Sequence, residues 1–203
     1  MNPFNPGYFD EGDLKDAGFK ALGHNVRIAK NCTIIGLENI EIGDNVRIDG
    51  YSSIIVAGKG WLKIGSFIHI AAYCRLAAVN GICMNDFSGL SHGVKIYSRI
   101  DDFSGEYLTN SMVPEKYTRV IAGAVTLGRH VAIGSGSVIL PKVTIGDGSA
   151  VGALSLVVGN LEPWGVFFGC PAKRLKDRSK RLLELEAQLR QEIIQQGALG
   201  GPI

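Results

Sequence analysis

The stretch of sequence from residue 121 to residue 158 reads IAGAVTLGRHVAIGSGSVILPKVTIGDGSAVGALSLVV. Aliphatic residues recur in it at every sixth position: Ile121, Leu127, Ile133, Ile139, Ile145, Val151 and Val157. An α-helix repeats every 3.6 residues and a strand alternates every two, so neither produces this spacing. A strict six-residue step predicts short strands joined by tight turns, each sending one bulky side chain inward. This is the pattern of a left-handed parallel β-helix.

The repeat continues towards the N-terminus in groups of three aliphatic residues. Three rungs of six residues make one coil of a triangular prism, so each group marks one coil. The sequence therefore predicts an all-β prism of about six coils over residues 21–172. The predicted inward residues are Leu22, Ile28, Ile34; Ile42, Ile48, Ile54; Ile64, Ile70, Leu76; Met84, Leu90, Ile96; Leu127, Ile133, Ile139; and Ile145, Val151, Val157.

The six-residue step is interrupted four times, always after the third rung of a coil. The extra residues number two after Ile34, four after Ile54, two after Leu76 and 25 after Ile96. All four insertions therefore leave the prism at one corner, where they do not disturb the stacked strands. A structureless loop as long as the last is uncommon unless it has a function. We predict a protruding arm at residues 98–126 that helps to build a site.

The two ends of the chain differ from the repeat. Residues 1–20 predict a short, polar, partly helical cap with Asp10 or Asp13 as N-cap. In residues 173–203, aliphatic side chains among charges predict an amphipathic helix over 173–196. This helix is expected to pack on the prism or on a neighbouring subunit, and the glycines from Gly197 onwards predict a frayed tail.

The composition argues against several classes of function. A net charge of +2 gives no bulk electrostatic reason to bind nucleic acid. No apolar run approaches the roughly 18 residues that span a membrane, and the first residues lack an export signal, so we expect a cytoplasmic protein without membrane insertion. Two of the four cysteines, Cys32 and Cys74, follow core aliphatics by four residues and are expected to be small core residues in a reducing cytosol.

The chain resembles the hexapeptide-repeat acyltransferases in its rungs, its single arm and the closing run Phe168-Gly169-Cys170-Pro171-Ala172-Lys173-Arg174-Leu175. The resemblance covers about residues 20–178. It is closest to the galactoside and xenobiotic acetyltransferases and to the sugar-nucleotide acetyltransferases of surface-polysaccharide synthesis, such as that of lipopolysaccharide O antigen. It implies a homotrimer with active sites between neighbouring prisms, acetyl-CoA as co-substrate, and an arm that reaches the next subunit. A prism with apolar-leaning faces and a hooked arm is also physically suited to such association.

The same resemblance implies which residues hold the coenzyme. Ser135 and Ala153 correspond to contacts with the pantetheine arm, and Gly159 to a contact further along it. Lys173 and Lys176, in the basic run after Pro171, correspond to cations that meet the CoA phosphates.

The catalytic histidine of the family is missing from its usual place early in the arm. There it deprotonates the acceptor, a task suited to a group that titrates near neutrality. The corresponding stretch here is Ile96-Tyr97-Ser98-Arg99-Ile100-Asp101-Asp102-Phe103, which contains no histidine. The alignment instead places Asp101 or Asp102 at this position.

Three explanations stay open. Asp101 or Asp102 acts as the base or orients the nucleophile, with the pKa of one raised by its like-charged neighbour near an apolar cleft. Alternatively His92, at a prism corner one rung before the arm, is the base. In the third case no protein base is needed, and positioning with an oxyanion donor suffices. Adjacent aspartates in a loop also commonly cap turns through their side chains.

Further residues are expected at the acceptor: His69, Tyr97, Arg99, Tyr107 and Asn110. His69 lies in a His-Ile-Ala sequence that is also seen in sugar-nucleotide N-acetyltransferases near the acceptor. Tyr97 and Arg99 stand at the start of the arm. The aromatic and amide side chains of the arm suit sugar rings and bases by stacking and hydrogen bonding. They would equally order an arm that docks onto another subunit.

An amine acceptor attacks thioesters well and needs a weaker base than a hydroxyl does. The missing histidine therefore favours N-acetylation of a nucleotide-linked amino-deoxysugar, and the alternative is O-acetylation of a sugar hydroxyl with His92 as base. A non-catalytic trimeric scaffold is a further alternative, but the Pro-Ala-Lys end and the small residues of the CoA track argue against it.

A metal-dependent enzyme of this fold, the γ-type carbonic anhydrase, needs three converging histidines, two of them five residues apart. The four histidines of this chain contain no such pair, and we expect no metal site: His24, His69, His92 and His130. His24 and His130 fall at corner positions and are expected to be solvated.

Overall fold

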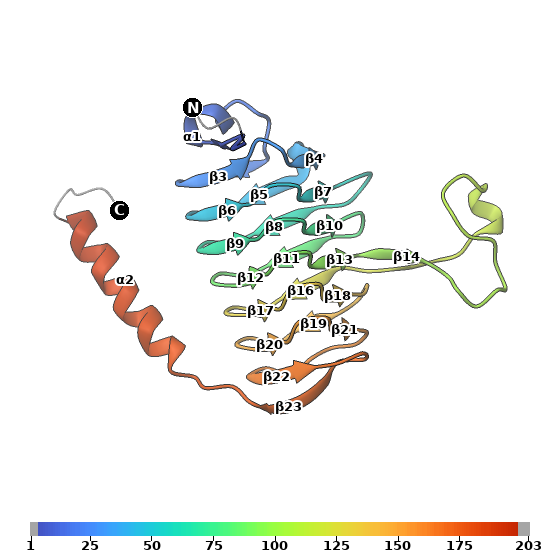
Figure 1. The fold of residues 1–203 in the computed structure, drawn as a ribbon. Coiled ribbons are helices and arrows are strands. Elements are labelled where there is room, and N and C mark those ends of the chain that lie inside the picture. Colours follow the sequence, from blue (N-terminus) through green and yellow to red (C-terminus); the bar gives the residue numbers. More distant parts are fainter. Residues whose placement is uncertain (1–3, 199–203) are drawn as a thin grey trace.

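The predicted parallel β-helix is confirmed by a computed structural model that describes residues 4–198 (Figure 1). The end of the predicted tail, residues 199–203, lies outside these described residues. Each coil contributes one strand to each of three sheets, which we call faces 1, 2 and 3 in the order in which the chain visits them.

The strands are short, and within each face they stack in coil order. Face 1 contains β2 (Ala21–Leu22), β5 (Ile40–Ile42), β8 (Leu62–Ile64), β11 (Ile82–Met84), β16 (Val125–Leu127) and β19 (Thr144–Ile145). Face 2 contains β1 (Tyr8–Phe9), β3 (Val26–Ala29), β6 (Val46–Ile48), β9 (Ile68–Ile70), β12 (Gly89–Leu90), β17 (Ala132–Ile133), β20 (Ala150–Val151), β22 (Gly165–Phe168) and β23 (Lys173–Asp177). Face 3 contains β4 (Thr33–Ile35), β7 (Ser53–Ile55), β10 (Arg75–Ala77), β13 (Lys95–Tyr97), β18 (Val138–Ile139) and β21 (Leu156–Val157).

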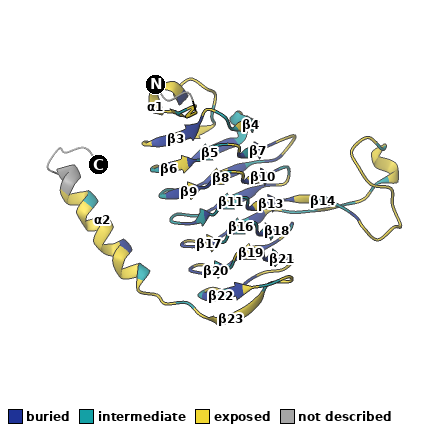
Figure 2. Ribbon diagram, in the orientation of Figure 1, coloured by how far each residue is buried: buried dark blue, intermediate teal, exposed yellow. Residues whose placement is uncertain are grey.

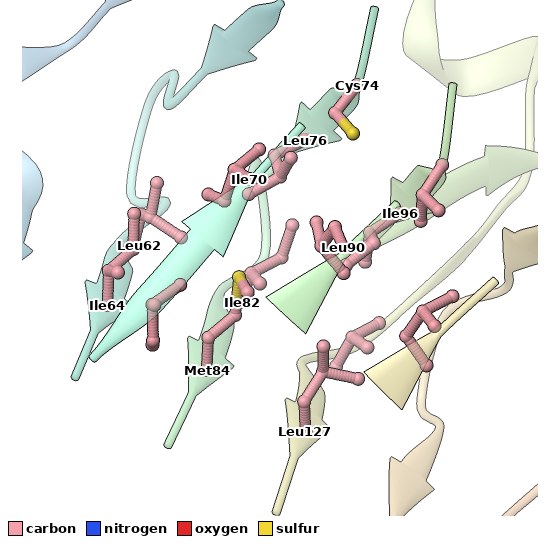
Figure 3. Packing of buried hydrophobic residues seen from close by; sticks show 14 of the residues in the cluster. Leu62, Ile64, Ile70, Cys74, Leu76, Ile82, Met84, Leu90, Ile96 and Leu127 are labelled. Atoms are coloured by element: carbon pink, nitrogen blue, oxygen red, sulfur yellow. The ribbon is translucent and has the colours of Figure 1, made fainter. Parts of the chain in front are cut away.

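The predicted inward aliphatics form the core of the prism. Figure 3 shows Ile70, Leu76, Leu90 and Ile96 pointing into its interior, and each is at most 2% exposed. Parallel pairing holds the inward residues of successive coils in register, as for Ile70 with Leu90. Each such side chain contributes roughly 1.5–3 kcal/mol by its burial. Because every coil repeats this contribution, the six-residue pattern is enough to specify the solenoid.

Six complete coils precede a partial seventh. The seventh begins where Leu161 bridges to Ile145 on face 1 and continues in β22 on face 2. Strand β23 then turns back and pairs antiparallel with β22. The edge of β22 is thereby paired, and the new edge strand β23 carries charged side chains that oppose further pairing.

The N-terminal cap contains the predicted short helix and one strand that was not expected. Helix α1 (Glu11–Leu14) is capped by Asp10, whose carboxylate accepts a hydrogen bond from the backbone amide of Asp13 at 3.0 Å. The strand β1 pairs antiparallel with β3 and starts face 2. Two residues give no periodicity from which such a strand could be recognised.

The arm leaves the prism at the corner between faces 3 and 1, as predicted (Figure 1). Its stem is an antiparallel pair, β14 (Arg99–Asp101) with β15 (Val120–Ala122), and its tip carries the 3-10 turn η2 (Glu115–Tyr117). The smaller insertion after β4 forms the 3-10 turn η1 (Leu37–Asn39). Two details of the prediction are wrong: β16 already belongs to the prism from Val125, and Ile121 is a 40% exposed residue of the stem rather than a rung.

The C-terminal segment also departs from its prediction. Residues 173–177 form strand β23 instead of the first turns of a helix, because they pair with the open edge of β22. Helix α2 begins only at Leu182 and runs to Ala198, through Gly197. Figure 2 shows this helix largely exposed; among residues 182–195 Glu186 is buried, and Leu182 and Ile193 are half-buried. It stands beside the corner between faces 1 and 2.

All four cysteines are free thiols. Cys74 is buried, and its Sγ donates to the Ser91 carbonyl at 3.2 Å. Cys32 is half-buried and donates to the Asp49 carbonyl at 3.3 Å. The predicted core roles of these two are therefore confirmed. Cys83 is half-buried in β11, and Cys170 is exposed.

Candidate active site

Three of the predicted residues lie in one column at the corner between faces 2 and 3. The inward residues two positions before them pair in register: Leu90, Ile133 and Val151. His92, Ser135 and Ala153 therefore stack on consecutive coils. The Gly136 amide donates to the His92 carbonyl at 2.9 Å, and the Leu154 amide to the Ser135 carbonyl at 2.8 Å. The candidate base His92 thus stands at one end of the predicted pantetheine column.

A cleft of about 750 Å³ lies between face 2 and α2. Its prism wall is smooth, because Gly89, Ala132 and Ala150 occupy successive outward positions of face 2. Its opposite wall carries one leucine per helical turn: Leu182, Leu185 and Leu189. Small residues on one wall and apolar side chains on the other leave room for an extended ligand.

Ser91 and His92 form the edge of this cleft at the corner between faces 2 and 3. The His92 side chain is exposed and makes no hydrogen bond or ion pair with another residue between 4 and 198. An accessible imidazole with an unengaged ring nitrogen can take a proton from an acceptor bound in the cleft.

His69 belongs to a polar network at the upper end of the cleft. Its Nε2 lies 2.7 Å from Asp49 Oδ2 and 2.9 Å from Arg47 Nη2. The Tyr8 hydroxyl donates to Asp49 Oδ1 at 2.7 Å. Desolvation acts to raise the pKa of the Asp49 carboxyl, but the hydrogen bonds from His69 and Tyr8 outweigh it, so this pKa lies below its ordinary value. Asp49 is therefore ionised and holds the ring of His69 in place.

Asp102 is engaged inside the arm. It is 8% exposed, and its carboxylate accepts from the Ser104 amide at 2.7 Å and lies 3.6 Å from Arg119 Nε. Hydrogen bonds from the Ser104 hydroxyl and amide, aided by the Arg119 charge, lower the pKa of Asp102. The raised pKa suggested for one of the two aspartates is therefore not found at Asp102. Opposite charge and hydrogen bonds at Asp102 outweigh any repulsion from its neighbour.

Asp101 and Asn110 lie together in the arm, where the backbone amide of Asn110 donates to Asp101 Oδ2 at 3.2 Å. Asn110 has a positive φ of 75°, and its side chain accepts from the Met112 amide at 2.9 Å. Both residues thus order the arm. Asp101 is less buried than Asp102 and keeps a second carboxylate oxygen for an outside partner.

The remaining arm candidates do not line the cleft of their own subunit. Tyr97 ends β13 and is half-buried, and Arg99 is exposed in the stem. The Arg119 guanidinium lies 5.5 Å from the centre of the Tyr107 ring, a cation–π contact that orders the tip. The arm projects away from α2 in Figure 1, so within one subunit it cannot complete the cleft.

The predicted coenzyme residues fall on more than one edge of the prism. Ser135 and Ala153 share the corner between faces 2 and 3. Gly159 follows β21 and lies at the corner between faces 3 and 1. A Cβ added to Gly159 would meet no atom within 4 Å. Lys173 and Lys176 are exposed on β23, opposite Phe168 and Val166. The lysines therefore stand at the lower end of face 2, on a strand and not on a helix.

His130 is not solvated, contrary to its prediction. Its Nε2 lies 2.6 Å from Glu186 Oε2, and its ring stacks on Phe87 at 5.0 Å between centroids. Helix α2 covers this corner, and single-sequence patterns do not show which corner a helix covers. Arg178 also donates to the His130 carbonyl at 2.7 Å, just before the helix begins. His24 is exposed, as expected, and pairs with Glu11 at 2.9 Å.

Sequence reasoning missed Tyr8, Arg47 and Asp49. A signal was present, since the segments Asn25-Val26-Arg27-Ile28 and Asn45-Val46-Arg47-Ile48 place like residues at the same position of successive coils. Within residues 4–198, no group of three His, Cys, Asp or Glu is arranged to hold a metal ion. No helix in that part of the chain has the length and apolar character to span a membrane.

A six-residue solenoid with one arm at a single corner and a column of small residues beside a cleft defines the hexapeptide acyltransferases. No family model matches the chain. The chain is, however, 43% identical over 180 residues to the dTDP-4-amino-4,6-dideoxy-D-glucose acyltransferase of Escherichia coli. The matched region covers 89% of this chain and 93% of that protein. The chain therefore belongs to the hexapeptide-repeat acyltransferases, and within them to the sugar-nucleotide acyltransferases.

Solved structures of AntD, an N-acyltransferase from Bacillus cereus, are similar over nearly their whole length. The complex with dTDP and 3-hydroxybutyryl-CoA is 39% identical with a TM-score of 0.88, and covers 94% of this chain and 99% of that one. A variant complex holds dTDP-4-amino-4,6-dideoxyglucose and coenzyme A, with the same identity and TM-score over 93% and 99% of the chains. Other AntD structures carry substitutions of an aspartate and of a serine ten residues before it. The predictions of an acyltransferase and of a CoA thioester as co-substrate are confirmed.

Proposed function

We propose that the protein transfers the acyl group of a CoA thioester to the 4-amino group of a dTDP-linked 4-amino-4,6-dideoxyhexose. The observation that carries this proposal is the near full-length similarity to an acyltransferase of that sugar, at 43% identity. The acceptor is the amino-deoxysugar class that the missing arm histidine favours. Acetyl is the acyl group expected from the sequence.

The spacing of the AntD substitutions supports a role for Asp101. A serine ten residues before an aspartate occurs twice in this sequence, at Ser91 with Asp101 and at Ser137 with Asp147. The near-complete overlap of the two chains favours the earlier pair. Ser91 lines the cleft, and Asp101 is the aspartate whose carboxylate is not fully engaged.

These two residues support a homotrimer. Within one subunit β13 separates them, with Ser91 at the corner between faces 2 and 3 and Asp101 beyond the corner between faces 3 and 1. They can share one site only if the arm of one subunit reaches the cleft of its neighbour. The exposed apolar side chains of the arm tip suit such a contact: Phe103, Leu108, Met112 and Tyr117.

The chemistry then needs little from the protein beyond positioning. The uncharged amine attacks the thioester carbonyl carbon, a C–N bond forms, the C–S bond breaks and CoA leaves as a thiolate, which takes up the equivalent of the proton lost by the amine and becomes the thiol. Asp101 accepts a proton from the amine nitrogen, and His92 at the end of the pantetheine column faces the thioester. Ser135 and Ala153 hold the pantetheine arm, and Lys173 and Lys176 meet the CoA phosphates below them.

We place this reaction in the cytoplasm, in the synthesis of a surface glycan such as the O antigen of lipopolysaccharide. Free thiols at all four cysteines fit a reducing compartment. A nucleotide-linked amidosugar is an activated donor for a glycosyltransferase, which is the class of enzyme that consumes it.

The test is thiol release together with mass spectrometry of the sugar nucleotide. The purified protein is given acetyl-CoA or 3-hydroxybutyryl-CoA with the dTDP-linked 4-amino-4,6-dideoxyhexose. The matched control acceptor is the dTDP-linked sugar with a hydroxyl in place of the amine. We expect the amino sugar alone to gain the acyl mass. Transfer only to the hydroxyl sugar, or coenzyme binding without transfer to either, would overturn the proposal.

A further inference from the structure

Three basic side chains stack directly above one another on the outer surface of face 2. Arg27 pairs in register with Arg47, and Arg47 with His69. Neighbouring strands lie about 4.8 Å apart, so these side chains project in parallel from three successive coils. Like charges directly opposite each other on neighbouring strands are destabilising. A column of this kind therefore needs a compensating anion.

On face 1, by contrast, charged side chains of neighbouring coils are compensated within the protein. There Glu41 pairs in register with Lys63 and lies 3.6 Å from its ammonium. Lys20 approaches the same carboxylate at 2.7 Å. Charges on face 1 thus alternate in sign, whereas on face 2 one cation follows another.

Among the described residues, Asp49 is the carboxylate that ion-pairs with this column, while Asp10, Glu11 and Asp44 line a neighbouring pocket with Arg27. Asp49 lies 3.1 Å from Arg47 Nε and 2.7 Å from His69 Nε2, and it also accepts from Tyr8. Asp49 thereby orients Arg47 and His69 from one side. Arg27 makes no ion pair with any residue between 4 and 198. The column keeps a net positive charge even with His69 neutral.

The column forms the floor of a recess of about 400 Å³. Its lining includes Asn25, Arg27, Asn45, Arg47, Phe67 and His69. His69 also lines the cleft beside α2, so the recess and the cleft meet at this residue. The recess combines two guanidinium groups with amides and an aromatic edge.

The recess lies within reach of the proposed reaction site. His69 pairs in register with Gly89, and Ser91 follows two residues later. His69 and Ser91 are separated by one strand spacing and by two residues along the strand. The distance between their backbones is therefore about 8 Å. A hexose ring with its glycosidic oxygen fits this interval.

We infer that Arg27, Arg47 and His69 form the diphosphate-binding subsite for the nucleotide sugar. This inference rests on the proposed function, and it names the residues that recognise the nucleotide. A diphosphate carries the negative charge that the column lacks, and the planar forks of two arginines match its oxygens. Asp49 and Tyr8 are positioning residues, since they hold Arg47 and His69 without touching the ligand.

The two substrates then enter from opposite ends of face 2. Acyl-CoA runs up from Lys176 through Ala153 and Ser135, and the nucleotide sugar runs down from Arg27. The amine and the thioester meet at Ser91 and His92. Neither substrate has to pass the other, so either can bind first.

The test measures direct binding and steady-state kinetics of Arg47→Gln, Arg27→Gln and the double variant. Calorimetry with dTDP should show at least a tenfold loss of affinity in the double variant. The KM for the nucleotide sugar should rise by a similar factor, while the KM for acyl-CoA stays within twofold. Inorganic pyrophosphate should inhibit the wild type competitively with the nucleotide sugar. It should no longer inhibit the double variant at the same concentration. Lys63→Gln removes an equally exposed cation from face 1 and should change none of these values.

Three results would overturn the inference. The first is an active double variant with unchanged KM for the nucleotide sugar. The second is loss of the oligomer in gel filtration with light scattering while each subunit still binds dTDP normally, since the arginines would then serve contacts between copies. The third is an equal rise in the KM of both substrates. Failure of the proposed function would look different: the wild type would acylate no nucleotide sugar, although dTDP binding would still depend on Arg27 and Arg47.

Discussion

The imidazole Nε2 of His130 lies 2.6 Å from Glu186 Oε2, and this contact joins the prism to the C-terminal helix. Both side chains are at most 8% exposed. Arg129 and Arg190 bind the other oxygen of the same carboxylate. One glutamate thus gathers three basic groups and sets the position of α2, which forms the outer wall of the cleft.

We expect Glu186→Gln to loosen α2 without unfolding the prism. The substitution leaves His130 and two arginines without their shared carboxylate, which costs roughly 1–3 kcal/mol in the free energy of helix docking. Hydrogen exchange of the amides in 182–195 should quicken, while exchange in the core strands stays unchanged. Glu184→Gln, an exposed change on the same helix, is the control. Equal exchange in both variants would show that the carboxylate does not hold the helix.

The same contact predicts a loss of helix docking in acid. Desolvation acts to raise the pKa of Glu186, but hydrogen bonds from Arg190 and His130 and the charge of Arg129 outweigh it, so this pKa lies below its ordinary value. A carboxyl whose pKa is lower when folded stabilises fully above its unfolded pKa of about 4.3, and this stabilisation is lost as the pH falls through the folded pKa. The protection factors of the α2 amides, which are corrected for the intrinsic pH dependence of exchange, should therefore be unchanged from pH 7 to 5 and fall below pH 4. Glu186→Gln should lose this acid dependence, and a step that persists in the variant would assign it to another group.

Sequence periodicity reveals contacts that repeat and misses contacts that occur once. Each rung from Leu22 to Val157 meets the same surroundings as the rung above it, so a single rule locates the core, its corners and its insertions. The contact between His130 and Glu186 joins residues 56 apart and occurs once, and no local pattern encodes it. Ile121 shows the opposite error: it keeps the six-residue phase, yet it lies in the arm stem.

The two isoleucines Ile133 and Ile121 provide a direct test of this distinction. Ile133 is 1% exposed in the core and Ile121 is 40% exposed. Ile133→Ala should lower the free energy of unfolding by about 2–5 kcal/mol, because a cavity adds to the lost burial. Ile121→Ala should change it by about 0.5 kcal/mol or less. Urea unfolding of both variants measures this difference, and similar losses would place Ile121 back among the rungs.

Thiol labelling should separate the four cysteines by burial. Desolvation raises the pKa of Cys74 to about 11, so its reactive thiolate is scarce at pH 8, and burial also raises the pKa of Cys32 and of Cys83. Cys170 is exposed. Iodoacetamide at pH 8 followed by peptide mass spectrometry should modify Cys170 first in the native protein and all four thiols in urea. Rapid native labelling of Cys74 would contradict its place in the core.

Removing the charge of each of the two adjacent aspartates of the arm should have a different effect: at Asp102 on the order of the arm, and at Asp101 on kcat. Asp102→Asn removes the carboxylate that binds Ser104 and Arg119, so it should loosen the arm, visible as faster hydrogen exchange over 102–119. Asp101→Asn keeps an oxygen to accept the Asn110 amide, so the arm should stay ordered. If Asp101 takes the proton of the attacking amine, its variant should lose about 100-fold or more in kcat with little change in either KM. An ordered Asp101→Asn variant with full kcat would leave His92 or positioning alone to account for proton removal. His92→Asn then decides between these two, because only a base at His92 predicts a further loss of kcat.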